Sequence, residues 1–138
     1  MLNGLFMMFG QLMGLAVIAL IVALIVQYAT RLVAGFTPTY WVAYRAVFVS
    51  YVASFAAGFF VTYLLMSQGV PTSPEAQVLI MIMGFFIQAV LYGVLLVSPI
   101  DGPIGFLKGV LISLIQLVVA LVLTAIFLGI AMFIEYVF

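Results

Sequence analysis

Four long apolar stretches, separated by short breaks that contain proline or glycine, dominate this sequence of 138 residues. A helix needs about 20 apolar residues to cross the hydrocarbon core of a bilayer, where no water satisfies a bare backbone group. The stretches therefore predict an all-α, polytopic transmembrane chain. We expect a single transmembrane domain over residues 1–138, with spans at approximately 5–30, 38–66, 75–97 and 103–136.

Charge is too scarce for a water-exposed surface. Hydrophobic residues make up 70% of the chain and charged residues only 4%, whereas a soluble domain carries about 25% charged residues. A soluble helical bundle of this composition would expose large apolar patches and aggregate. The lipid bilayer is therefore the first expected partner. Because the first apolar run lacks a basic leader and exceeds a signal peptide's core of about 7–15 residues, we expect it to remain in the membrane.

The breaks between the stretches carry signals for helix starts. A hydroxyl residue precedes a proline at Thr37 and again at Ser73, a typical way to begin a helix. Glu75 adds an acid to the first turn, where the helix dipole favours it. The turn at 101–103 ends in another proline. Because the loops are short, consecutive helices should pack antiparallel in a four-helix bundle.

The few charged residues predict the orientation. Arg31 and Arg45 flank the first loop and Lys108 follows the third, while Glu75 and Glu135 lie on the opposite side. The positive-inside rule then places loops 1 and 3 in the cytoplasm and both termini outside (N-out/C-out). We expect an integral protein of the bacterial inner (cytoplasmic) membrane.

Aromatic and basic residues gather at this border of the membrane. Such residues are typical of the headgroup region, and Arg and Lys side chains can extend outward to water. An aromatic cage for a cationic ligand is the less favoured interpretation. The expected interfacial anchors are Tyr40, Trp41, Tyr44, Arg45 and Lys108.

Scarce polar residues recur in one order, which predicts an internal repeat. Gln27 and Gln88 each precede a proline by eleven residues. Residues 45–50 (RAVFVS) then align with residues 108–113 (KGVLIS), each with a base first and a serine last. The alternative to a duplication is that the two halves acquired similar residues independently, because both segments lie at the membrane border.

The repeat would divide the chain into halves 1–68 and 69–138, each a helical hairpin. Because each half contains two spans, both copies insert in the same orientation. Such a parallel repeat has its axis along the membrane normal. The predicted architecture is thus two tandem hairpins.

The repeat places four intramembrane polar side chains at similar depth, about 10–15 Å from the cytoplasmic border at helical rise. The favoured interpretation is packing, because such side chains hydrogen-bond between spans for about 0.6 kcal/mol each. The alternative is a polar ring that lines a pathway or binds a small polar ligand. The four residues are Gln27, Ser50, Gln88 and Ser113.

Small residues spaced four apart let membrane helices approach closely. The densest set covers residues 53–58, where we expect a tight helix contact within the bundle or between two chains. The residues expected to pack helices are Gly10, Gly14, Ala53, Ser54, Ala57, Gly58, Ala125 and Gly129. Other polar residues, such as Gln116 and Thr124, are more scattered.

Residue types that are missing limit the function. The chain has no His, no Cys and only three separated carboxylates, so we expect no metal, no cofactor and no catalytic constellation. Three basic residues make no nucleic-acid surface. We therefore expect no enzyme.

Two classes of function remain. The first is a structural or accessory membrane subunit that packs in a homo- or hetero-oligomeric complex, with itself or with other membrane protein subunits. The alternative is a small oligomeric channel or transporter for a small solute, which would use the polar ring. A role in binding lipid or a lipophilic cofactor is the least favoured.

Overall fold

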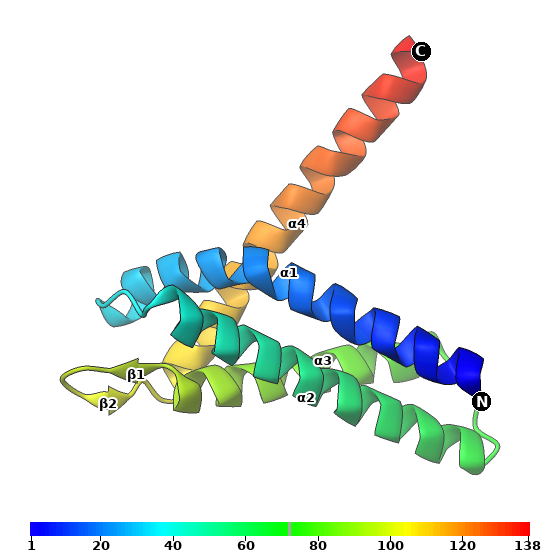
Figure 1. Ribbon diagram of the computed structural model, residues 1–138, viewed down its shortest axis with the longest axis horizontal. Helices are drawn as coiled ribbons and strands as arrows, with labels where there is room; N and C mark the ends of the chain where they lie inside the picture. Colours follow the sequence, from blue (N-terminus) through cyan, green and yellow to red (C-terminus); the bar gives the residue numbers. More distant parts are fainter. Residues whose placement is uncertain (72) are drawn as a thin grey trace.

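Four long helices make up most of the computed structural model, which describes residues 1–71 and 73–138 (Figure 1). All four helices are long and apolar enough to cross a membrane. This confirms the predicted all-α chain with four candidate spans. The helices are α1 (Leu2–Ala34), α2 (Tyr40–Ser67), α3 (Pro74–Leu95) and α4 (Phe106–Val137).

The predicted helix starts are partly correct. Ser73 caps α3, accepting from the Ala76 amide at 3.2 Å, with Pro74 in the first turn. For α2 the capping residue is Thr39, two residues after the predicted Thr37. The carbonyl of Pro38 accepts a hydrogen bond from a side chain of α1. Pro38 therefore stays outside α2.

The third loop contains a short antiparallel ladder between β1 (Val97–Ser98) and β2 (Gly102–Pro103). Gly102 has a positive φ of 76°, which the turn between these strands requires and which glycine adopts readily. The ladder takes up residues that the hydropathy pattern assigned to spans. As a consequence α3 ends earlier than predicted and α4 begins later, at Phe106.

The helices α1, α2 and α3 lie side by side, with consecutive helices antiparallel, whereas α4 leaves them (Figure 1). The buried residues of α4 all lie in its first part, residues 106–116. None of residues 117–137 is buried, and all but Val119 are exposed. The predicted four-helix bundle therefore needs a correction: it consists of three helices and only the first part of α4. We call residues 117–137 the distal arm.

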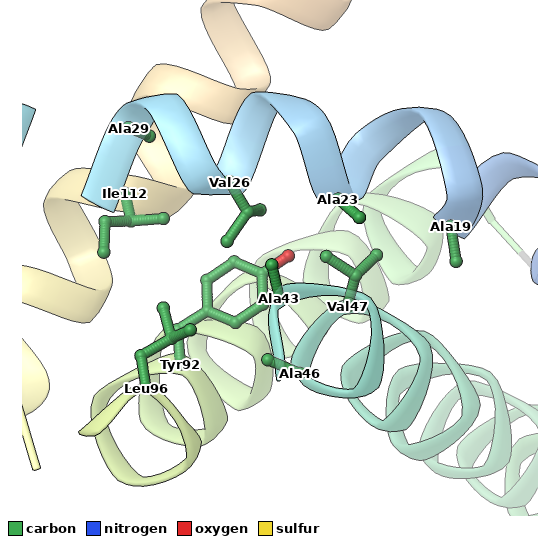
Figure 2. Packing of buried hydrophobic residues seen from close by; sticks show 10 residues of the cluster. All are labelled: Ala19, Ala23, Val26, Ala29, Ala43, Ala46, Val47, Tyr92, Leu96 and Ile112. Carbon is green, nitrogen blue, oxygen red and sulfur yellow. The ribbon is translucent and has the colours of Figure 1, made fainter. Parts of the chain in front are cut away.

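Small side chains bring α1 and α2 together. The α1 residues Ala19, Ala23 and Val26 are fully buried and follow one face of the helix. Figure 2 shows them turned toward Ala43 and Val47 of α2. Because lipid is as apolar as these side chains, their contact stabilises the pair mainly through dispersion at close range.

The closest backbone approach joins α3 and α4. A Cβ atom added to Gly93 would lie 2.6 Å from the Gly105 carbonyl oxygen, and one added to Gly109 would overlap the carbonyl of Ala89. The Gly105 amide also donates to the Gly93 carbonyl at 3.1 Å. Near the predicted contact at 53–58 the approach is looser, since a Cβ on Gly58 would meet only a side-chain methyl, at 3.3 Å. The α3–α4 crossing therefore depends on glycine.

We expect Gly109→Ala to lower the free energy of unfolding in detergent by about 1–3 kcal/mol, because the added methyl would force the two backbones apart. The matched control is Gly129→Ala in the distal arm, where nothing lies within 4 Å of the added atom. The control should be neutral or stabilising by up to about 1 kcal/mol through helix propensity. Equal destabilisation by both variants would contradict the assigned crossing.

Candidate functional site

Four polar side chains meet where α2, α3 and α4 converge. The Gln116 side-chain carbonyl accepts from the Tyr92 hydroxyl at 2.6 Å and from the Gln88 amide at 3.2 Å. The Gln116 amide donates to the Tyr51 hydroxyl at 2.9 Å. Gln88 also donates to the Tyr92 hydroxyl, at 2.9 Å. We call Tyr51, Gln88, Tyr92 and Gln116 the polar cluster.

Helix geometry and burial hold the cluster in place. Gln88 and Tyr92 are four residues apart and share one face of α3. The Tyr92 ring extends from α3 toward side chains of α1 and α2 (Figure 2), and the residue is fully buried. Gln116 is only 7% exposed. In such a low-dielectric interior a connected network is strong, and the loss of one member leaves the others unpaired.

The residues of the predicted polar ring enter separate interactions. Gln27 donates to the main-chain carbonyl of Pro38 at 2.9 Å, and Ser50 donates to that of Ala46 at 2.6 Å. Gln88 belongs to the polar cluster. Ser113 is buried, and its hydroxyl has no hydrogen-bond partner among the residues that the structure describes. The two glutamines thus have unlike partners, and the tandem repeat stays a prediction.

Two hollows lie beside the cluster. The central groove, of about 480 Å³, runs between α1 and α3 over α2, and Tyr51 is part of its wall. The α3–α4 pocket, of about 230 Å³, includes Gln88, Ser113 and Gln116 in its lining. The central groove is otherwise lined by Leu15, Ile18, Ser54, Phe55, Ile80, Met81 and Gly84. Side chains of the polar cluster therefore reach both hollows.

The expected interfacial anchors divide into two groups. Tyr40 and Tyr44 donate to main-chain carbonyls of α1, at 2.6 and 3.4 Å. Trp41, Arg45 and Lys108 are exposed. The rings of Tyr40 and Trp41 meet edge to face at a centroid distance of 5.6 Å. The tyrosines thus also join α2 to α1.

The small residues of the prediction differ in their surroundings. Ser54 donates to the carbonyl of Gly84 at 3.3 Å and so joins α2 to α3. A Cβ atom added to Gly10, Gly14 or Gly129 would meet nothing within 4 Å in the described chain. Ala125 is likewise exposed. These last positions make no close contact inside the chain.

Sequence reasoning missed the centre of the cluster. Gln116 was grouped with scattered polar residues, and neither Tyr51 nor Tyr92 was singled out. Tyr51 nevertheless lies eleven residues after the start of α2, and Tyr92 follows Gln88 by four residues on α3. The spacing of Gln88 and Tyr92 is the signal that could have found it, because a polar pair at i and i+4 marks one face of a helix.

Comparison with protein-family models finds no match, and comparisons with curated proteins and with solved structures find no significant match either. Among the described residues no group of three His, Cys, Asp or Glu side chains could hold a metal ion.

Gln116→Leu should lower the free energy of unfolding in detergent by about 2 kcal/mol, because it removes three hydrogen bonds of about 0.6 kcal/mol each. Thr124→Val is the control on the same helix, since Thr124 is exposed and donates only to the Ala120 carbonyl, at 2.8 Å. The control should change stability by less than about 0.5 kcal/mol. If Gln116→Leu is as mild as the control, the cluster contributes no stability.

Proposed function

We propose that this protein is a non-enzymatic structural subunit of a larger membrane complex, in which the distal arm packs against another membrane-spanning chain. The observation that carries the proposal is the course of α4. Its helix is the most apolar of the four, yet its distal arm has no buried residue. The partner is a second copy or a different membrane protein.

Unpacked glycines support a partner rather than lipid alone. A glycine inside a helix costs about 0.5–1 kcal/mol relative to alanine, so its usual benefit is a close contact. Gly129 lies four residues after Ala125 on the distal arm, and Gly10 lies four residues before Gly14 on α1. A Cβ atom added to any of these three glycines would meet no other helix of the described chain within 4 Å. A second chain would supply the contact.

The central groove supports the same proposal, because it is a surface that could receive a helix of another chain. Residues of α1, α2 and α3 line it, and it runs between α1 and α3, the two helices between which α4 would lie in a closed bundle. The lining is apolar apart from Tyr51 and Ser54. A membrane helix from another chain would fit this surface and complete the bundle.

We also propose the bacterial inner membrane as the location, with loops 1 and 3 in the cytoplasm. The exposed bases Arg31 and Arg45 flank the first loop, and Lys108 lies in the first turn of α4. Loop 2 is followed by Glu75. All three basic residues therefore lie near loops 1 and 3, and the positive-inside rule assigns the side richer in Lys and Arg to the cytoplasm.

Cysteine scanning tests the subunit role, because the native chain has no cysteine. Single cysteines at 117–137 should give intermolecular crosslinks in native membranes with a period of about 3.6 residues, strongest near Ala125 and Gly129. The crosslinked mass identifies the partner. Val94→Cys, an exposed position on α3 away from the arm, is the control and should react less. A chain that stays uncrosslinked at every arm position would overturn the proposal.

Orientation is tested by labelling with a membrane-impermeant thiol reagent. Ile100→Cys in loop 3 and Gln68→Cys after α2 are both exposed positions. In intact cells we expect Gln68→Cys to react. We expect Ile100→Cys to react only after the membrane is made permeable, because loop 3 is proposed to be cytoplasmic. The reverse pattern would show the opposite orientation.

A small oligomeric channel or transporter is the second candidate, favoured by the polar lining of the α3–α4 pocket. Under this alternative Gln88→Leu should abolish solute flux in proteoliposomes while the protein still inserts. Unchanged flux would exclude a pathway through Gln88.

A further inference from the structure

A pocket of about 340 Å³ lies where the beginning of α2 meets the end of α3. Figure 1 shows these two ends side by side, at the end of the bundle that also carries loops 1 and 3. The volume falls within the range of about 300–1,000 Å³ that is usual for pockets that bind small molecules. We call it the α2–α3 pocket. It is lined by Val42, Arg45, Ala46, Val49 and Leu95.

Arg45 is the one charged residue in this lining. It is exposed, and the described residues that line the pocket include no Asp or Glu to pair with it. Val42 and Val49 lie on the same face of α2 as Arg45 and are 38% and 42% exposed. A guanidinium group is always charged and binds phosphate through two parallel hydrogen bonds. The pocket thus combines one cationic group with an apolar wall.

The length of α2 places Arg45 at the level of the lipid head groups. The helix has 28 residues, about 42 Å at helical rise. This exceeds the hydrocarbon core of about 30 Å by about 12 Å. Trp41 and Arg45 in the first two turns are typical of the head-group region, whereas the last turn, residues 64–67 (LLMS), has neither charge nor aromatic ring. Val49 lies one turn deeper than Arg45, so the apolar wall extends toward the acyl chains.

We propose that the α2–α3 pocket binds an anionic phospholipid, with the phosphate group at Arg45 and an acyl chain along Val49 and Leu95. The opposite charges of phosphate and guanidinium select the head group. A zwitterionic lipid carries the same phosphate, but its cationic group weakens the attraction. An apolar helix of another chain would leave the charge of Arg45 against apolar side chains, which is unfavourable. The site does not depend on the proposed subunit role.

The fluorescence of Trp41 reports on this site. Trp41 is the only tryptophan of the chain and is 64% exposed. It precedes Arg45 by four residues, so the two side chains are neighbours on one helix face, with Cβ atoms about 5–6 Å apart. Bromine on a lipid chain quenches tryptophan fluorescence only at short range. Quenching by a brominated phospholipid therefore measures how often that lipid occupies the surroundings of the pocket.

The intact protein is reconstituted in vesicles that mix phosphatidylglycerol with phosphatidylcholine, and one lipid at a time carries bromine on its acyl chains near the head group. Phosphatidylglycerol should quench Trp41 as if it bound about fivefold more tightly than phosphatidylcholine, the effect of about one basic residue at an anionic surface. Equal quenching by the two lipids at equal mole fraction would overturn the proposal. Absence of quenching by either lipid would also overturn it, because protein would then cover this face.

Variants assign the preference to Arg45. Arg45→Gln removes the charge at an exposed position and should reduce the preference for phosphatidylglycerol to less than about twofold. The matched control is Lys108→Gln, which removes another exposed base, in the first turn of α4 and outside the pocket lining. The control should keep the preference. An equal loss in both variants would contradict the site, because the preference would then come from the positive charge of this border as a whole.

Inorganic phosphate distinguishes a lipid from a free ion. Phosphate added to the buffer at constant ionic strength should leave the preference unchanged, because the ion has no acyl chain to lie along the apolar wall. Loss of the preference on addition of phosphate would identify the free ion as the occupant and would overturn the assignment to a phospholipid.

Discussion

The contact between the backbones of α3 and α4 determines the course of the second half of the chain. Gly93 and Gly109 let the two helices approach until a Cβ atom added to either would collide with a carbonyl oxygen. The short ladder of β1 and β2 and the bond from Ile104 to the Leu96 carbonyl hold the turn beside this crossing. The direction of α4 follows from the crossing. Its first part enters the core, and its distal arm leaves α1, α2 and α3 (Figure 1).

The same crossing positions the polar cluster. With Gly109 against α3, the next turns of α4 place Ile112 in the core and Gln116 within hydrogen-bonding distance of Tyr92. In lipid, apolar burial adds little to helix association, so dispersion at close range and buried hydrogen bonds stabilise the arrangement. The α1–α2 pair instead packs through alanines and through tyrosine hydroxyls bonded to main-chain carbonyls. The two hairpins are therefore held together in different ways.

The sequence was most informative about the helices themselves. Long apolar runs identify four candidate spans because bare backbone is so unfavourable in hydrocarbon, and Ser73 with Pro74 marks the start of α3 correctly. The two-stranded ladder was missed, because two-residue strands leave no periodic pattern. The α3–α4 crossing was missed because Ala89 and Gly93 have the same spacing as several pairs that contact nothing. Such pairs become distinguishable only when the partner backbone is in place.

The arm and the polar cluster were missed for related reasons. The arm is apolar on every face, so its sequence is equally compatible with a bundle interior, lipid or another chain. Tyrosine is common at membrane borders, which concealed the part that Tyr51 and Tyr92 play inside the spans. The role of Gln116 depends on three polar side chains from α2 and α3 that hydrogen-bond to it, and its position in the sequence does not indicate these partners.

The distal arm diverges from α1, α2 and α3 of its own chain, and a distance between two spin labels tests this divergence. Leu79→Cys near the start of α3 and Phe133→Cys near the end of α4 are exposed positions in a chain without native cysteine. The doubly labelled protein is measured in vesicles, diluted with excess unlabelled protein so that only intramolecular pairs contribute. We expect a long distance between the two labels, well beyond that between neighbouring helices. A distance typical of adjacent helices, whose axes lie about 10 Å apart, would show that α4 folds back along α3 and would contradict it.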